Sequence, residues 1–495
     1  MSRLTRRDFM KGAAFVSGAA VASGLPLRAW SKALGANDDV RVAVVGLGGD
    51  VGTRRGAEHI DVFRGLEGVR VAALCDADRE SLEREARKFT ERNEKVNTYV
   101  DVRKLLEDKN IDAIVIATPN HWHSLLTVWA CQAGKDVYVE KPVSHNIWEG
   151  RKAVEAARKY KRIVQAGTQS RSEAGLAEAF EYIKRGEIGK IVVARGFCYK
   201  RRPSIGKVDG PQPIPKSVDY DLWTGPAALE PLRRKNLHYD WHWVWPTGNG
   251  DIGNQGIHEM DMCRWALGQK GLSPKVMSIG GRFGYDDDGR TPNTQIAVFD
   301  YEPAPIVFEV RGLSRKKEDP IMDEYKGVRI GVVIECEGGY FAGGAGGGWV
   351  HDKDGNKVKQ FVSDGGVGHQ ANFIKAVRSR KTSDLNADIL EGHISSALCH
   401  MANISYRLGR LSSPDQIRET IKNQPKVLET FERFREHLSA NEVDLSSERP
   451  VLGPWLQMDV KEERFVSKDE YGIGRWANEL LRRGYRKPFV VPEKV

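Results

Sequence analysis

Two short segments of the chain carry side chains suited to stabilising a negative charge and moving a proton. The first ends in Glu140 and Lys141, directly before a proline. A lysine ammonium in this place can stabilise the alkoxide that develops when a carbinol loses its hydride. The second segment, residues 248–268, contains His258, whose imidazole can relay the proton. Lys141 and His258 are therefore the candidate catalytic residues.

The segment around His258 predicts a helix from about Asp251 to Gly268, where the glycine ends it. In such a helix Asn254 and His258 lie one turn apart on the same face, and Asp261 follows them. We expect Asn254 and His258 to contact the substrate together. The alternative is that the imidazole of His258 makes only structural hydrogen bonds and takes no part in the chemistry.

A glycine turn follows the first apolar segment of the chain. Residues 40–45 predict a short buried strand, and Gly46, Leu47 and Gly48 come directly after it. Glycines in this place allow a tight turn and a close approach of the backbone to a pyrophosphate at the start of a helix. Residues 50–55 resemble an insertion into the usual spacing. The turn predicts a dinucleotide site.

The next predicted strand, residues 69–75, ends in Asp76. A carboxylate at the end of the second strand accepts hydrogen bonds from ribose hydroxyls, which favours NAD as the cofactor. Arg79 follows closely and leaves NADP open.

Strands and helices continue to alternate up to about residue 160. Residues 111–117 and 136–140 predict further buried strands, and residues 80–92 and 122–132 predict helices. This alternation predicts an α/β domain with a doubly wound parallel sheet, a Rossmann fold over residues 37–160. Its ligands should bind at the carboxyl ends of the strands. The candidate cofactor-binding residues at those ends are Thr118, Pro119, Asn120, Glu140 and Lys141.

Residues 161–410 predict a second domain of the α+β class. Its later strands follow one another without long helices, so we expect an open, mainly antiparallel sheet. We expect residues 343–348 to form a flexible loop between strands, and residues 411–495 to form a wrapping extension without a chemical signal. The segments with strand character are 189–200, 275–283, 295–301, 306–313 and 328–335.

The glycine turn, the run Ala117-Thr-Pro-Asn-x-x-His123 and the triplet Glu140-Lys141-Pro142 resemble the glucose–fructose oxidoreductase, inositol dehydrogenase and rhizopine-catabolism (Gfo/Idh/MocA) family. The resemblance covers about residues 38–410. It implies hydride transfer between a sugar or sugar derivative and a tightly bound NAD. It also implies a homo-oligomer that forms through the C-terminal sheet.

The same resemblance matches His258 to the family's catalytic histidine, and this match is what favours a catalytic over a structural role. It also assigns His123 to cofactor binding and places Gln169 and Arg171 near the nicotinamide pocket. One residue departs from the pattern, because the family's dehydrogenases usually have an aspartate one turn before the histidine, where this chain has Asn254. An amide can orient the imidazole but gives it no charge support, so we expect His258 to be hard to protonate. Asp251 or Asp261 could take the place of the missing carboxylate.

Two aromatic clusters, residues 220–226 and 238–245, are candidates for a sugar pocket. Trp223 in the first cluster could stack on the apolar face of a pyranose. A packed structural corner is an equal alternative. His238 and His242 have i,i+4 spacing, but no carboxylate stands at the spacing of a zinc site, so we expect no metal.

Composition excludes some other functions. Much of the formal net charge of +9 comes from the first 36 residues, which hold six Arg or Lys and one Asp. The rest of the chain has no basic stripe with interleaved aromatic residues, so we expect no nucleic-acid partner.

The first 36 residues predict an export signal. Arg6 and Arg7, followed by Phe9 and Lys11 and then by a weakly apolar run, resemble a twin-arginine signal. We therefore expect a periplasmic or otherwise exported protein that folds around its cofactor first and is not embedded in a membrane after cleavage. Two alternatives to a sugar dehydrogenase stay open: a glycoside-cleaving enzyme that works through a transient keto-sugar, and an exported sugar-binding protein without catalysis.

Overall fold

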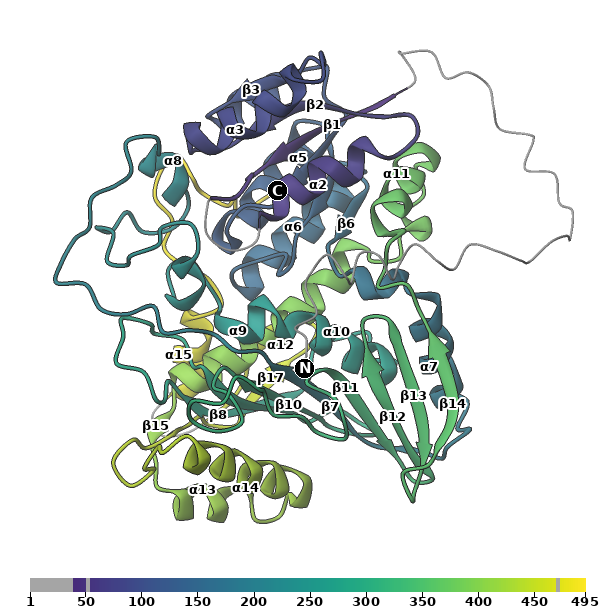
Figure 1. Ribbon diagram of the computed structural model, residues 1–495, viewed down its shortest axis with the longest axis vertical. Coiled ribbons are helices and arrows are strands. Elements are labelled where there is room, and N and C mark those ends of the chain that lie inside the picture. The colour runs from purple at the N-terminus through teal and green to yellow at the C-terminus, as the bar shows by residue number, and fades with distance from the viewer. Residues whose placement is uncertain (1–38, 50–53, 469–471) are drawn as a thin grey trace, which may run out of the picture. The chain divides into compact units, whose positions relative to one another are not determined.

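The computed structural model describes residues 39–49, 54–468 and 472–495 (Figure 1). The expected export signal, residues 1–36, lies outside the described residues, and so do residues 50–53 after the glycine turn. Residues from Val40 to Val495 belong to one unit. Within the described ranges, none of the helices combines the length and the hydrophobicity that a membrane crossing requires.

The first sheet is parallel, as predicted, and is buried on both faces. Its order is β3-β2-β1-β4-β5-β6, and each neighbouring pair is parallel. Along β1, Val42 and Val44 face one apolar layer, whereas Ala43 and Val45 face the other. The strands are β1 Val40–Val45, β2 Val69–Cys75, β3 Asn97–Tyr99, β4 Ala113–Ile116, β5 Asp136–Val139 and β6 Val164–Ala166. Because β6 belongs to this sheet, the domain extends beyond the predicted boundary at residue 160.

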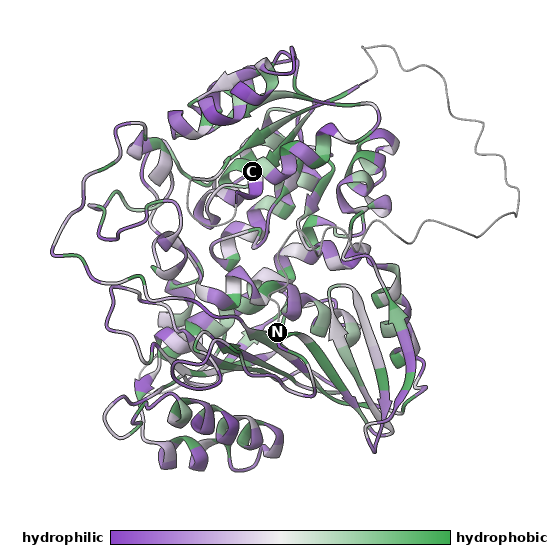
Figure 2. Ribbon diagram, viewed as in Figure 1, coloured by the Kyte–Doolittle hydropathy of each residue, from purple (hydrophilic) through white to green (hydrophobic). Residues whose placement is uncertain are grey.

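Helices cover both faces of this sheet, which makes it doubly wound. Helices α2, α3 and α11 pack on the face of Val42 and Val44, and α4, α5 and α6 pack on the opposite face. The strands between them are largely hydrophobic, whereas α3 is mostly hydrophilic (Figure 2). The helices are α2 Arg55–Arg64, α3 Arg79–Thr90, α4 Val102–Glu107, α5 His123–Gln132, α6 Ile147–Lys159 and α11 His369–Ser379.

The second sheet is mixed and mostly antiparallel, as predicted. Its order is β14-β13-β12-β11-β7-β10-β9-β8-β16-β15, and β17 and β18 attach beside β8. Strands β7 and β10 pair in parallel near its centre. The strands are β7 Ile191–Tyr199, β8 Lys275–Gly281, β9 Thr294–Phe299, β10 Ile306–Arg311, β11 Ile330–Cys336, β12 Gly339–Gly344, β13 Gly347–Asp352, β14 Lys357–Val362, β15 Arg410–Leu411, β16 Val451–Leu452, β17 Leu456–Asp459 and β18 Arg464–Phe465.

Helices cover this sheet on both faces as well. Helices α7, α10 and α12 pack on the face toward the first domain, and α13 and α14 cover β8, β9 and β10 on the other face (Figure 1). The apolar surface on which a homo-oligomer contact was expected is thus partly covered by the chain itself, and oligomerisation stays a prediction. The remaining helices are α7 Ala174–Lys184, α8 Tyr220–Thr224, α9 Gly250–Asn254, α10 Gly256–Ala266, α12 Ile389–Arg407, α13 Pro414–Ile421, α14 Pro425–Ala440 and α15 Ile473–Glu479.

The C-terminal extension contacts both domains. Strands β16 and β17 pair with β8 of the second sheet. Further on, Phe489 packs edge to face against Trp122 of the first domain, and Lys159 donates to the backbone oxygen of Val495. The extension therefore makes contacts with both the mixed sheet and the parallel-sheet domain.

The glycine stretch 343–348 is a hairpin and not the flexible loop that we expected. Gly343 pairs with Gly348, and Gly344 pairs with Gly347, where β12 turns into β13. A Cβ at Gly343 would lie 2.4 Å from the oxygen of Gly347. The two backbones approach so closely here that only glycine fits. The high glycine content of this segment, from which we expected flexibility, instead reflects this close approach.

The helix predicted over residues 251–268 is interrupted at Gln255, between α9 and α10. The amide of His258 donates to the oxygen of Gln255 at 3.1 Å and so leaves the oxygen of Asn254 outside the helical ladder. Gly253 and Gly256 flank the break, and glycine weakens a helix interior. Because of this break, the backbone oxygen of Asn254 can accept a hydrogen bond from a donor outside the helix.

Candidate active site

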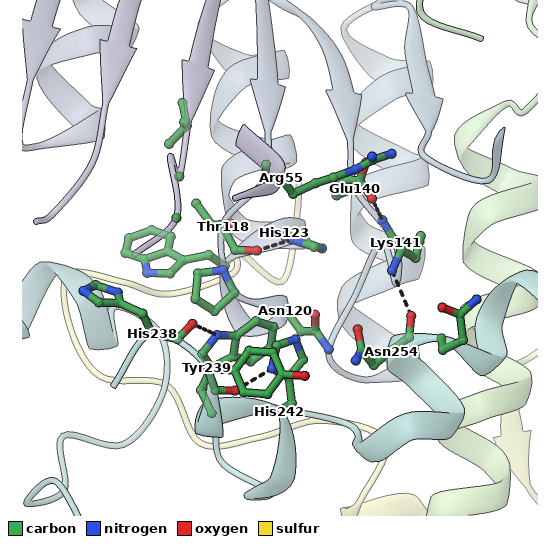
Figure 3. A pocket seen from close by; sticks show the side chains of 18 of the residues that line it. Arg55, Thr118, Asn120, His123, Glu140, Lys141, His238, Tyr239, His242 and Asn254 are labelled. Atoms are coloured by element: carbon green, nitrogen blue, oxygen red, sulfur yellow. Dashed lines mark hydrogen bonds and ion pairs between the residues drawn. The ribbon is translucent and has the colours of Figure 1, made fainter. Parts of the chain in front are cut away.

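A large cavity lies at the carboxyl edge of the parallel sheet and reaches α9 and α10 of the second domain (Figure 3). Its volume is about 890 Å³, within the range of small-molecule and cofactor sites. Leu47 and Arg171 are not part of its wall. The predicted site residues that line it are Gly46, Gly48, Asp76, Thr118, Pro119, Asn120, His123, Glu140, Lys141, Gln169, Trp223, Asn254 and His258.

Gly46 and Gly48 shape one end of the cavity. Both have φ of +84°, in the left-handed region that favours glycine. A Cβ at Gly46 would lie 2.6 Å from the backbone nitrogen of Thr118. The glycine turn can therefore approach β4 closely only without a side chain, which leaves bare backbone along the cavity.

Asp76 is tied to this turn. Its carboxylate accepts from the amide of Leu47 at 2.6 Å and from the amide of Asp78 at 2.9 Å. Burial raises the pKa of Asp76, and the two amide hydrogen bonds work against that rise. Leu47 thus serves the predicted site through its backbone amide, which orients the acid, and not through its side chain.

The ends of β4 and β5 are joined by His123. Its ring nitrogens lie 2.6 Å from the oxygen of Pro142 and 2.7 Å from the oxygen of Thr118, and burial lowers the pKa of the ring. Asn120 donates from its side chain to that of Asn249 at 3.1 Å, which links the parallel sheet to the start of α9. These residues hold the cavity wall in place, and the Lys141–Pro142 peptide bond at this corner is cis.

Glu140 is a buried carboxylate with two partners. It accepts from Arg55 Nε at 2.8 Å and lies 2.8 Å from His59 Nε2. Burial opposes its charge, but Arg55, His59 and Lys141 together outweigh burial and hold the pKa of Glu140 well below its ordinary value. Gln169 completes this group when its amide is oriented with the nitrogen toward Gly167: the nitrogen then donates to the oxygen of Gly167 at 2.8 Å, and the amide oxygen accepts from Arg55.

Lys141 extends from the first domain to the second. Its Nζ donates to the backbone oxygen of Asn254 at 2.8 Å (Figure 3). Burial lowers the pKa of Lys141, and the neighbouring Glu140 works in the opposite direction. The amine therefore stands at the junction of the domains, and near neutral pH a larger share of it is uncharged than in an exposed lysine.

His258 faces the same cavity from α10. Burial and the nearby Lys141 lower its pKa to about 3, so the ring is neutral at ordinary pH. This agrees with the expectation that His258 is hard to protonate, although burial is the main cause. Asn254 meets Lys141 through its backbone oxygen, and the helix break at Gln255 means that the two residues do not share one continuous helix face.

Neither aspartate replaces the carboxylate missing at position 254. Asp251 is held by two hydrogen bonds from Arg202, at 2.8 and 2.7 Å. Asp261 accepts two from Arg171, at 2.8 and 2.9 Å. Arg171, which we expected near the nicotinamide pocket, does not line the cavity, because this ion pair and a contact with the Trp265 ring turn its guanidinium into the second domain.

The two aromatic clusters combine both alternatives: some of their residues line the cavity, and some pack together in an apolar cluster. Trp223 belongs to an apolar cluster with Val218 and Leu232 that packs against Ala77. This places Trp223 on the Asp76 side of the cavity, so we assign it to the cofactor end and not to the sugar end. His242 and Tyr239 line the cavity near Asn254 (Figure 3).

Among the cavity residues that sequence reasoning missed, three are linked to one another. Lys200 follows β7, and its Nζ donates to Gln255 Oε1 at 2.9 Å. Gln255 Nε2 donates in turn to Glu259 Oε1 at 3.2 Å. Burial raises the pKa of Glu259 to about 8. Glu259 directly follows His258, so its position next to a candidate histidine was the one available signal; Lys200 offered none.

The cavity fits a dinucleotide. Gly46 and Gly48 form a cradle that side chains would fill, and Asp76 stands at the end of β2 for a ribose. The hydroxyl oxygen of Thr118 is buried and has no hydrogen-bond partner in the described part of the chain. These groups could hold the diphosphate, the adenosine ribose and the nicotinamide half, respectively.

Two models of one oxidoreductase family match this chain. The model of its NAD-binding Rossmann fold matches residues 40–168, and the model of its C-terminal alpha/beta domain matches residues 188–327. The first match ends just after β6, in agreement with the observed extent of the parallel sheet.

Individual relatives cover less of the chain. It is 24% identical to a myo-inositol 2-dehydrogenase of Thermotoga maritima over 52% of this chain and 64% of that protein. It is 28% identical to a glycosyl hydrolase family 109 protein of Shewanella baltica over 32% of this chain and 38% of that protein. The match thus spans less than two thirds of each of these relatives.

The fold has a solved counterpart. The WlbA dehydrogenase from Bordetella pertussis, in complex with NADH and UDP-GlcNAcA, has a TM-score of 0.55 at 19% identity. The match covers 74% of this chain and 97% of that one.

Proposed function

Since the chain belongs to the Gfo/Idh/MocA oxidoreductase family, with an NAD-binding Rossmann domain, we propose that it oxidises or reduces a CH–OH group of a sugar or sugar derivative with NAD. The observation that carries the proposal is the placement of Lys141. Its amine lies in the same cavity as the glycine turn and Asp76 and bonds to Asn254 of the other domain at 2.8 Å.

NAD, when bound, supplies the hydride acceptor or donor. The backbone at Gly46 and Gly48 would hold its diphosphate, and Asp76 its adenosine ribose. Glu140 and its partner Arg55 fix the turn that carries Lys141. All these groups come from the first domain, whereas the sugar would lie against the second.

Lys141 acts on the sugar hydroxyl. As an ammonium it stabilises the developing alkoxide, and as an uncharged amine it takes the hydroxyl proton. Its lowered pKa favours the second role more than in an exposed lysine. His258, with a pKa of about 3, is a weak base, and its neutral ring orients the hydroxyl as a hydrogen-bond acceptor. The proton relay that we expected of His258 therefore falls mainly to Lys141.

The cofactor can be tested directly. We expect the purified full-length protein to release about one NAD(H) per chain when it is denatured, because the glycine turn and Asp76 hold the cofactor and the expected export route carries a protein already folded around it. Identification of the nucleotide by mass spectrometry is the measurement. A protein that neither releases a nicotinamide nucleotide nor binds added NAD would refute the proposal.

A redox-neutral glycosidase is the second candidate. The similarity to glycosyl hydrolase family 109 proteins favours it. Such a reaction would return its hydride to the sugar and leave NAD unchanged overall. Release of free sugar from a glycoside without net NADH would distinguish it from a dehydrogenase. A protein that binds sugars but never reduces its NAD would be the non-catalytic alternative.

Export by the twin-arginine route is also part of the proposal, supported by Arg6 and Arg7 in residues 1–36. Replacement of both by lysine should leave folded protein with its cofactor in the cytoplasm, as cell fractionation would show. Normal export of this double variant would contradict it.

A further inference from the structure

The part of the cavity that faces the sugar carries a positive charge without a matching carboxylate. Lys200 Nζ bonds to the neutral amide of Gln255 at 2.9 Å. Among the residues that the structure describes, no carboxylate lies within ion-pairing distance of it. Lys200 lines the cavity and is half-buried.

The other charges of the wall are already paired. Arg202 is neutralised by Asp251, with bonds of 2.8 and 2.7 Å. Arg55 is neutralised by Glu140 at 2.8 Å. Among the described residues of the wall, Lys200 and Lys141 are then the two amines whose Nζ has no carboxylate as hydrogen-bond partner. They bond to consecutive residues, Lys141 to Asn254 and Lys200 to Gln255. Both residues line the same cavity, and the charge of Lys200 contributes to the lowered pKa of Lys141, so the two amines lie close enough to interact.

Glu259 does not supply the missing negative charge. Glu259 is 2% exposed, and burial raises its pKa to about 8, which favours the uncharged carboxylic acid over the carboxylate. One of its oxygens, Oε1, accepts from Gln255 at 3.2 Å. The other, Oε2, is buried without a hydrogen-bond partner in the described ranges. A buried hydroxyl of this kind calls for an acceptor.

We propose that Lys200 and Glu259, held together by Gln255, form a subsite for the carboxylate of an acidic sugar, so that the substrate is a sugar acid such as a uronic acid. One carboxylate oxygen would accept from the Lys200 ammonium, and the other from the protonated Glu259. This inference rests on the proposed function and specifies its substrate class.

Each feature of the wall favours a carboxylate. A neutral sugar would leave Lys200 uncompensated inside the cavity, and a buried charge without a partner is costly. A phosphate with two charges would find one free lysine and one acid, which is a poor match for its oxygens. Asn254 contributes as well, because an aspartate in its place would add the negative charge that the ligand supplies.

The test uses the full-length protein with its cofactor bound. Glucuronate, glucose and glucose 6-phosphate serve as probes, and titration calorimetry gives the dissociation constant of each. We expect glucuronate to bind more tightly than both of the others. Lys200→Gln should weaken glucuronate about 10- to 100-fold, the worth of a charge-assisted hydrogen bond, and should change glucose little.

Two variants keep this test interpretable. Arg201→Gln removes a neighbouring exposed positive charge and should leave glucuronate binding unchanged. Lys200→Arg keeps the cation and should keep most of the affinity, which separates loss of charge from loss of fold. The cofactor content of every variant is measured by release of the nucleotide.

The outcomes separate the two proposals. Equal binding of glucose and glucuronate, or tight glucuronate binding in Lys200→Gln, would overturn the acidic-sugar subsite while leaving the NAD proposal intact. Preference for glucose 6-phosphate would overturn the carboxylate assignment. Absence of bound or bindable NAD from the wild-type protein would instead refute the proposed function itself.

Discussion

The two halves of the cavity differ in how completely their polar groups are satisfied. In the cofactor half, Asp76 accepts two backbone amides, and Glu140 is held by Arg55 and His59. In the substrate half, Glu259 keeps an unpartnered oxygen in the described structure, and Lys200 bonds only to an amide there. The polar groups of the cofactor half are thus held in place by other parts of the protein, whereas those of the substrate half can still form hydrogen bonds with a ligand.

The comparison predicts that chemistry and cofactor retention can be separated. Lys141→Ala should lower the rate of sugar oxidation by about 10²–10⁴, as loss of acid–base help typically does. Its cofactor content should stay close to that of the wild type, because the glycine turn and Asp76 are untouched. Steady-state kinetics and nucleotide release are the two measurements.

Lys104→Ala is the matched control for that variant, since Lys104 is 68% exposed on α4. It should change neither quantity. Full activity in Lys141→Ala would show that Lys141 has no chemical role.

Glu140 in the cofactor half and Glu259 in the substrate half should make contributions of opposite sign to the pH dependence of folding stability. The pKa of Glu140 is held well below its ordinary value, so its charge stabilises the fold above the ordinary pKa, and this stability is lost as pH falls through the folded pKa. Glu140→Gln should destabilise the protein at neutral pH by about 3–5 kcal/mol, as breaking a buried pair does.

For Glu259, whose pKa is raised from 4.5 to about 8, the unfolded chain loses the proton first. Wild-type stability should then fall as pH rises from 4.5 to about 8, by at most about 1.4 kcal/mol per pH unit. Glu259→Gln should remove that fall and be stabilising at neutral pH. Urea unfolding across this pH range, at matched cofactor content, measures both variants, and a shared sign would contradict the contrast between the halves.

The smallest expected effect concerns the ribose. Asp76→Ala should weaken NAD binding by about 1–3 kcal/mol, the cost of lost hydrogen bonds to a charged group, without altering which sugar the enzyme prefers. Glu80→Ala, an exposed site in α3, is its control. Unchanged retention of NAD in Asp76→Ala would mean that this acid does not face the ribose.

The same contrast explains what the sequence could predict. Strands β1 and β2 begin and end at the predicted residues, because short apolar runs bounded by glycine and aspartate have few alternative interpretations. The cofactor residues follow these strands directly, so their positions follow from the topology.

The substrate half is harder to predict, because it is assembled from distant segments. Lys200 meets Gln255 only through the pairing of β7 within its sheet and the break before α10. Arg171 turned to Asp261 because a buried carboxylate competes for it, which spacing does not reveal. Glu259 was overlooked beside His258, since a carboxyl group is recognised as a neutral acid only when its burial is known.

The most direct test of the central claim follows the hydride itself. The protein with its bound NAD is mixed with a sugar acid that carries deuterium on the oxidised carbinol carbon, and the released nucleotide is analysed by mass spectrometry. We predict deuterium in the nicotinamide ring of NADH from the wild-type protein and none from Lys141→Ala, although both variants release the nucleotide. If the wild-type protein releases only unlabelled nucleotide after mixing with the deuterated sugar acid, the result would contradict the placement of a sugar carbinol against the cofactor in this cavity.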